Sequence, residues 1–173
     1  MLKKGDIWVS AVLYIALGTI VIVVLLAAGL PVINKLKDRN VVLQTKELMY
    51  TVDDTIRTVI NEGPGSQRQL NPFVIKAGSF YVYKNSVNWS FETKAVVIEP
   101  KIEKKEGTLD IYEEEARKEG FYNFNLGADY LNVAELRLNS QYSNPFSGEY
   151  SLYVKNPGEF TKDDLPIIEI KIS

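Results

Sequence analysis

The acidic side chains are the residues of this sequence whose types and spacing come nearest to a chemical site. Three consecutive glutamates at 113–115 lie near Asp110 and Glu119, and a second acidic pair stands at 163–164. Hard cations such as Ca²⁺ bind carboxylate oxygens, but they need a loop that arranges several of them around one point. Neither cluster has the spacing of a calcium loop, so a solvated charged surface is the better interpretation of both. We therefore predict no metal site.

Catalysis has little support in the residue types. Asp53 and Asp54 lie one turn before Arg57 on a predicted helix, where such a pair contributes only ~0.2–0.5 kcal/mol to helix stability. The chain contains no cysteine and no histidine, so it lacks a thiolate nucleophile and the commonest general base. The glycine-rich stretch at 63–68 lacks the lysine of a phosphate-binding loop. We expect a protein that is not an enzyme and has no catalytic residues and no cofactor.

The charge of the chain argues against a nucleic-acid partner. The formal net charge is −2, and the lysines and arginines form no basic stripe. Affinity for nucleic acid comes largely from neutralising phosphates with clustered cations. We expect no nucleic acid among the partners.

One sequence motif points to a covalent modification. Asn88, Trp89 and Ser90 form an N-x-S acceptor sequence for N-glycosylation, in a segment with the pattern of a strand. Such short motifs also arise by chance, and an occupied site needs an outward-facing asparagine. Asn88 is the possible glycosylation site of this chain.

The dominant element of the sequence is an uncharged run at its amino end. Residues 7–34 contain no Asp, Glu, Lys or Arg, and as a helix they would span roughly 40 Å, more than the ~30 Å hydrocarbon core of a membrane. The run is too long for the apolar region of an ordinary cleaved signal peptide, and a buried core helix is a poor alternative at this length. Trp8 and Tyr14 stand where aromatic side chains favour a membrane interface. Lysines flank both ends of the run, so charge alone does not give its orientation.

The helical pattern continues beyond the apolar run. We expect Pro31 to kink the helix, because it lacks a backbone donor and crowds the preceding turn. Apolar residues then recur at spacings of three and four up to Ile60, as an amphipathic helix requires, and Gly63-Pro64-Gly65 ends the pattern. The sequence predicts one long helix over residues 6–62.

The remainder, residues 63–173, has the period-two alternation of β-strands. At 167–173, for example, isoleucines alternate with Glu169 and Lys171. We expect a charged turn or loop at 101–107. The predicted class is α+β, with the long amino-terminal helix followed by an antiparallel, β-rich, sandwich-like domain, or by a strongly bent sheet, that the second half of the helix covers on one face. The expected strands are 79–84, 87–93, 94–99, 107–114, 134–140, 149–155 and 167–173.

The order of these elements resembles the archaeal type IV pilin-like proteins. Lys3, Lys4 and Gly5 resemble the end of the class III leader, which a membrane aspartic peptidase, the prepilin peptidase, cuts after the glycine. The resemblance implies a leader at residues 1–5, cleavage between Gly5 and Asp6, and a mature chain that keeps its apolar helix. At the fifth mature position, where many members of the family carry glutamate, this chain has Ser10.

The resemblance also implies a function. The chain would be a structural subunit that is stored in membrane lipid with its carboxyl-terminal domain outside the cell membrane. It would then polymerise through its helix, with copies of itself or with other pilin-like subunits, into a surface filament or a secretion machine. The alternative is a single-span membrane-anchored protein that never polymerises and whose β domain binds a ligand or senses a signal at the cell surface.

Overall fold

The computed structural model describes residues 4–94 and 99–173, with the side chains of Trp8 onward apart from Pro31. The chain divides into two compact units, Met1–Lys37 and Asp38–Ser173. The helix α1 (Lys4–Glu62) contributes its first part to the first unit and its second part to the second.

The helix α1 ends where the sequence predicts. Glu62 is its last residue, and the following Gly63 has a φ of 82°, a left-handed conformation that glycine adopts without steric cost. The helical hydrogen-bonding pattern continues through position 31, so Pro31 does not divide α1 into two helices. A bend at Pro31 stays a prediction.

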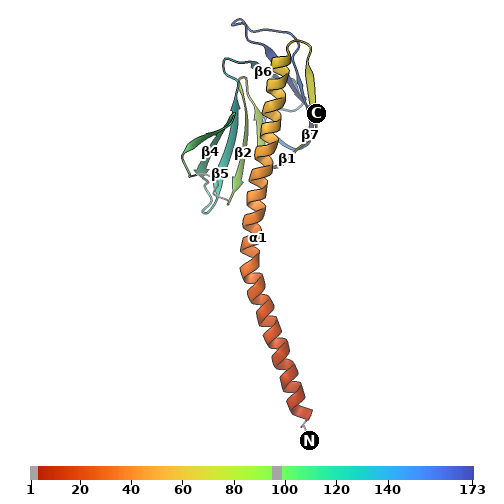
Figure 1. The fold of residues 1–173 in the computed structure, drawn as a ribbon, viewed down its shortest axis with the longest axis vertical. Coiled ribbons are helices and arrows are strands. Elements are labelled where there is room, and N and C mark those ends of the chain that lie inside the picture. Colours follow the sequence, from red (N-terminus) through yellow and green to blue (C-terminus); the bar gives the residue numbers. More distant parts are fainter. Residues whose placement is uncertain (1–3, 95–98) are drawn as a thin grey trace. The chain divides into compact units, whose positions relative to one another are not determined.

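The carboxyl-terminal unit contains eight strands in a single sheet (Figure 1). The strand order is β3-β4-β5-β2-β1-β7-β8-β6, and every neighbouring pair is antiparallel except β6 and β8. The predicted α+β class is confirmed, and the strands form one sheet rather than two facing sheets. The strands are β1 (Gln67–Val82), β2 (Ser86–Thr93), β3 (Glu103–Glu106), β4 (Leu109–Glu115), β5 (Tyr122–Asp129), β6 (Glu135–Leu138), β7 (Phe146–Lys155) and β8 (Ile167–Ile172).

The sequence patterns missed two parts of this sheet and assigned a third wrongly. The whole of β5 and residues 67–78 of β1 were not predicted, and the charged segment expected to be a turn or loop at 101–107 contains β3. Asn and Gly in β5 have low strand propensity, yet β5 is paired along its length with β2 and β4, so its neighbours stabilise it. The charges of β3 suit a strand at the edge of a sheet, where they discourage pairing with other chains. The strand expected at 94–99 falls largely on residues outside the described ranges.

One face of the sheet and the second part of α1 share a hydrophobic core. The helix contributes apolar side chains one or two turns apart, namely Val42, Met49, Val52, Ile56 and Val59. At the centre of the core, Phe73, Phe80 and Trp89 meet edge to face, with ring centroids 5.2 to 6.0 Å apart. The indole of Trp89 donates a hydrogen bond of 2.9 Å to the carbonyl oxygen of Ala77, so its polar atom is satisfied.

Gly78 allows β1 to pass close to β2. Its φ is 72°, and a Cβ built at this position would lie 2.0 Å from the carbonyl oxygen of Ser90 and 2.4 Å from the Cβ of Phe91. The pairing of β1 with β2 covers only Ser79–Val82, whereas β1 pairs with β7 from Gln67 onward. The first half of β1 therefore diverges from β2 at Gly78, and only glycine fits at the point of divergence.

We expect Gly78→Ala to lower the free energy of unfolding of the carboxyl-terminal unit by about 3 kcal/mol or more, because it adds backbone strain and a clash with backbone atoms. Gly120→Ala is the matched control, since Gly120 has a φ of 74° but nothing within 4 Å of the added Cβ. The control should lose only about 1–2 kcal/mol. Unfolding of the full chain in a neutral detergent, followed by near-ultraviolet circular dichroism, measures the free energy of unfolding of both variants. Equal losses of stability in the two variants would contradict the proposed clash at Gly78.

Candidate functional site

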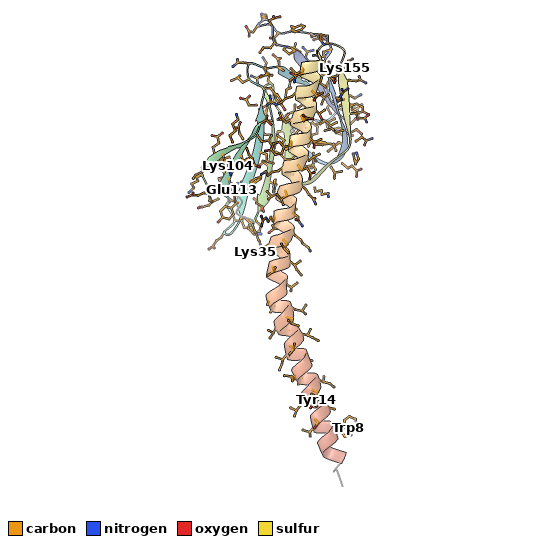
Figure 2. The ribbon with its side chains drawn as sticks, viewed as in Figure 1. Trp8, Tyr14, Lys35, Lys104, Glu113 and Lys155 are labelled. Atoms are coloured by element: carbon orange, nitrogen blue, oxygen red, sulfur yellow. The ribbon has the colours of Figure 1, made fainter. Side chains whose placement is uncertain are left out.

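The apolar segment of α1 has the highest exposure of large hydrophobic side chains in the described part of the chain. Trp8 is 75 % exposed and Tyr14 is 74 % exposed, and both project from the helix (Figure 2). The large aliphatic side chains from Val9 to Leu36 are about half exposed or more. The helix is long and apolar enough to cross a membrane, and none of its most apolar part is buried.

The backbone groups of this segment are satisfied within the helix. The backbone is helical throughout, and the hydroxyl of Thr19 donates a hydrogen bond of 2.8 Å to the carbonyl oxygen of Ile15. Helices can lie in lipid because every backbone donor and acceptor is bonded internally. The segment therefore offers a largely apolar surface, on a backbone whose polar groups are bonded within the helix.

The predicted leader residues lie at the start of the same helix. Lys4, Gly5 and Asp6 belong to α1, whereas Lys3 falls outside the described residues. Cleavage between Gly5 and Asp6 stays a prediction.

The pair Asp53–Arg57 is part of a buried polar cluster rather than a simple surface pair. Asp53 is 2 % exposed and accepts hydrogen bonds of 2.9 and 3.0 Å from Nε of Arg57. It also accepts hydrogen bonds from the hydroxyls of Thr108 and Tyr130, the latter at 2.9 Å. The guanidinium carbon of Arg57 lies 5.2 Å from the centroid of the Tyr130 ring. Strand spacing gave no sign that Thr108 and Tyr130 meet this carboxylate, since they come from distant parts of the chain.

A second polar contact joins the helix to the hairpin of β3 and β4. Lys46 forms an ion pair of 2.7 Å with Glu106, and the hydroxyl of Tyr50 donates a hydrogen bond of 2.7 Å to the Glu106 carbonyl oxygen. Lys46, Tyr50 and Asp53 lie on one side of α1, at spacings of four and three residues. Three polar side chains of the helix therefore bind this hairpin, Lys46 and Tyr50 at Glu106 and Asp53 at Thr108.

The hydroxyls of Tyr130 and Tyr50 in these contacts both have raised pKa values. Burial and the adjacent carboxylate of Asp53 raise the pKa of the Tyr130 hydroxyl far above its ordinary value. Burial and the carboxylates of Glu106 and Asp53 also raise the pKa of Tyr50. Both side chains stay neutral and act as hydrogen-bond donors, which is a structural use of these groups.

The predicted solvated surface at 113–115 is wrong for its first residue. Glu113 is fully buried, on the core side of β4 with Leu109 and Ile111, whereas Glu114 and Glu115 are exposed. The strand alternation places every second residue inside, so a charged side chain at an inward position is buried. Within residues 4–94 and 99–173, no group of three acidic side chains is arranged to hold a metal ion.

Asn88 lies on the outer face of the sheet. It stands in β2 between Val87 and Trp89, both of which are buried in the core, so its own side chain points the opposite way. The neighbouring position on β5 is Gly127, and a Cβ there would lie 3.2 Å from Oδ1 of Asn88. The outward orientation that glycosylation requires is therefore present.

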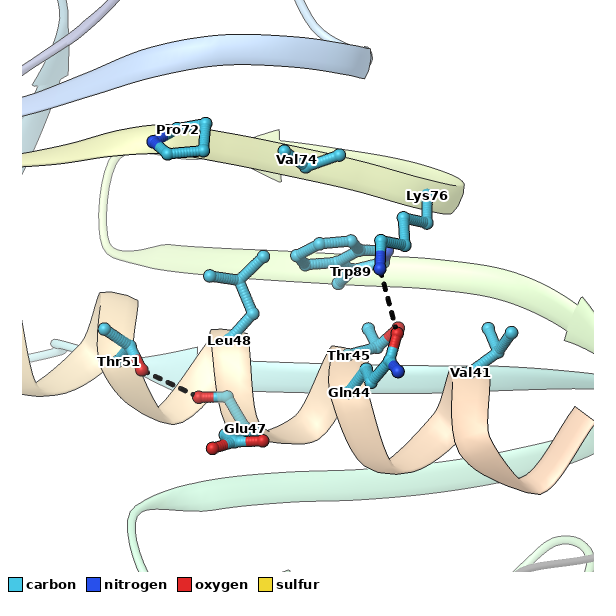
Figure 3. A pocket seen from close by; sticks show the side chains of 10 residues that line it. All are labelled: Val41, Gln44, Thr45, Glu47, Leu48, Thr51, Pro72, Val74, Lys76 and Trp89. Carbon is cyan, nitrogen blue, oxygen red and sulfur yellow. Dashed lines mark hydrogen bonds between the residues drawn. The ribbon is translucent and has the colours of Figure 1, made fainter. Parts of the chain in front are cut away.

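A groove that the sequence gave no sign of lies between α1 and β1 (Figure 3). Its volume is about 390 Å³, and its walls include the apolar side chains of Leu48, Val74 and Trp89. At one end, Nζ of Lys76 donates a hydrogen bond of 3.2 Å to Oε1 of Gln44. The remaining lining residues are Val41, Thr45, Glu47, Thr51 and Pro72.

Comparisons of this chain with protein-family models, with curated proteins and with solved structures found no match.

We expect Tyr130→Phe to destabilise the carboxyl-terminal unit by about 1.5–3 kcal/mol at neutral pH, because it removes a buried hydrogen bond to a carboxylate. The folded-state pKa of Tyr130 is raised, so its contribution is complete below the unfolded value of ~10 and is lost as the pH rises above it. The variant should therefore lose less stability than the parent above pH ~10. Thermal unfolding at several pH values measures this, and identical alkaline slopes would contradict it.

We expect the native chain to carry a glycan at Asn88, visible as a mass above that of the polypeptide. Asn88→Gln and Ser90→Ala should each abolish the added mass, since the motif needs both residues. Asn125→Gln is the matched control, because Asn125 lies on the same face in β5, paired with Ser90, but outside such a motif. An unmodified native chain would refute the site.

Proposed function

We propose that this chain is a structural, non-enzymatic subunit of a type IV pilus-like surface filament or secretion machine. The amino-terminal helix would hold the subunit in the membrane before assembly and form the core of the filament afterwards. The β domain would face the outside of the cell. The proposal keeps the prepilin peptidase as the enzyme that cuts after Gly5.

One observation carries this proposal. The hydrophobic core of the unit Asp38–Ser173 begins on α1 at Val42 and includes no side chain of the apolar segment before it. The β domain is therefore complete without that segment. The apolar segment is free to exchange one apolar environment for another while the domain stays folded.

The energetics favour such an exchange. Burial of apolar surface contributes about 25 cal/mol per Å², so an all-apolar helix removed from lipid is far more stable against other helices than in water. Residues with small side chains, such as Gly18 and Gly29, have nothing within 4 Å of an added Cβ and leave room for close helix approach. Small residues are common in membrane helices generally, so they permit bundling without requiring it.

The second candidate is a membrane-anchored protein that does not polymerise. The same exposed helix supports it, because a single span needs only length and apolarity. The groove between α1 and β1 would then be a place for a ligand on the β domain. The two candidates differ in two observable properties, which are the amino terminus of the mature chain and the presence of the chain in fibres.

We expect the native protein to begin at Asp6 and to be the repeating chain of fibres sheared from the cell surface. Gly5→Phe should block processing and abolish the fibres, because the bulky side chain occupies the position before the cut. Ile22→Val, a conservative change in the same helix and away from the cut, should be processed and assembled as the parent is. Amino-terminal mass spectrometry and electron microscopy measure both outcomes. A mature chain that keeps Met1, together with cell-surface fibres that lack the chain, would favour the anchored alternative.

A further inference from the structure

The groove between α1 and β1 has the size and lining to accept an aromatic side chain. Leu48, Val74 and Trp89 supply apolar walls around a volume of about 390 Å³. An apolar cavity of about 150 Å³ is already large enough to bind benzene. The groove is open to solvent in the isolated chain, and the partly exposed side chains of Leu48 and Val74 face water there, whereas Trp89 is almost fully buried beneath them.

Two polar side chains in the groove lack the partners that similar residues have elsewhere. Thr45 is 5 % exposed, yet in the described part of the chain its hydroxyl has no hydrogen-bond partner, whereas Thr51 and Thr55 each donate to the carbonyl one turn back. Lys76 bonds only to Gln44, and no carboxylate of the described residues lies within ion-pair distance of it. The carboxylate of Glu47 points away from β1 in Figure 3. The groove therefore presents the ammonium group of Lys76 without an ion pair, and the hydroxyl of Thr45 without a hydrogen bond, to any described residue.

A complementary feature lies on the loop between β7 and β8. Phe160 is 51 % exposed there, and Lys162, Asp163 and Asp164 follow it, so these three charged residues together carry one net negative charge. Hydrogen bonds of 2.8 Å fix the loop, from Thr161 N to the Leu165 carbonyl and from Ile167 N to the Glu159 carbonyl. The loop thus holds a phenyl ring in solvent on an ordered backbone, which reduces the entropy lost when the ring is buried.

The loop and the groove are too far apart to meet within one molecule. The loop packs beside the carboxyl end of α1, where a Cβ at Gly158 would lie 3.2 Å from Cβ of Pro64. The groove lies on α1 between Val41 and Thr51. From Leu48 to the end of the helix at Glu62 the rise is about 20 Å. The two features therefore face different ends of the β domain.

We propose that the Phe160 loop of one copy of this chain fills the α1–β1 groove of the next copy. The phenyl ring packs against Leu48 and Val74, and the carboxylates of Asp163 and Asp164 lie near the ammonium group of Lys76. A contact between two different patches of the same molecule is heterologous, so repetition produces an open filament rather than a closed dimer. This inference rests on the proposed function and assigns the β domain its own part in assembly.

The first test measures the yield of fibres sheared from cells that produce equal amounts of each variant. Phe160→Ala should lower the yield about tenfold or more, because each contact loses the burial of one phenyl ring. Tyr142→Ala is the matched control, since Tyr142 is 52 % exposed on another loop, and its yield should stay within about twofold of the parent. Both substituted positions are exposed, and equal melting temperatures of the isolated variants verify their folding.

The second test uses the absence of cysteine from the chain. Two differently tagged copies, one with Lys76→Cys and one with Asp163→Cys, are produced together and treated with a short thiol-specific cross-linker. The mixed dimer should form when assembled fibres are treated, and it should not form when the chains are dispersed in detergent before the cross-linker is added. Lys155→Cys, on the outer face of β7, replaces Lys76→Cys in the control and should give no mixed dimer.

These outcomes distinguish failure of the groove contact from failure of the filament proposal. If the parent chain forms fibres, but Phe160→Ala matches Tyr142→Ala in yield or Lys76→Cys gives no mixed dimer with Asp163→Cys, the groove contact is wrong and the filament proposal stands. If the parent chain forms no fibres, the filament proposal and this contact both fall. Loss of fibres with Phe160→Ala together with the specific cross-link supports the contact.

Discussion

The constraint on which the rest of the structure depends is that the apolar part of α1 needs a non-aqueous environment that the chain itself does not supply. The side chains around Trp8 and Tyr14 are exposed, and the core of the β domain begins only at Val42. Apolar surface of this extent is unfavourable in water by the usual area relation. Cover by lipid or by other protein chains would remove this cost, and the core of the β domain includes no side chain of the apolar segment.

The single helix α1 meets two different requirements along its length. Over residues 7–34 it contains no charged residue, as suits a segment surrounded by lipid or by other helices. From Val42 onward one side is buried against the sheet and the other is polar, as in any amphipathic helix of a folded domain. Lys35, Lys37 and Arg39 mark the change, because charged side chains there keep that part of the helix in water.

Sequence patterns predicted the helix, its end before Gly63 and the α+β class, because long periodic segments and glycine–proline stops are strong local signals. They missed β5, whose Asn123, Asn125 and Gly127 disfavour a strand locally while two neighbouring strands stabilise it. They also missed the burial of Asp53 and Glu113, because whether a carboxylate is solvated depends on which elements pack over it. The groove is likewise lined by side chains from α1, β1 and β2, which no local pattern brings together.

The polar contacts of Asp53 and Lys46 have a role that apolar packing alone would serve less well. Rows of aliphatic side chains on a helix can slide by one turn and still bury similar area, so they define the axial position of a helix weakly. A buried carboxylate that accepts hydrogen bonds from Arg57, Thr108 and Tyr130 has only one position in which all partners are satisfied. A one-turn shift would leave Asp53 buried and unpaired, at a cost of several kcal/mol. In a subunit whose helix is drawn from a membrane during assembly, such a cluster would keep the helix and the sheet in register while the apolar segment changes its surroundings.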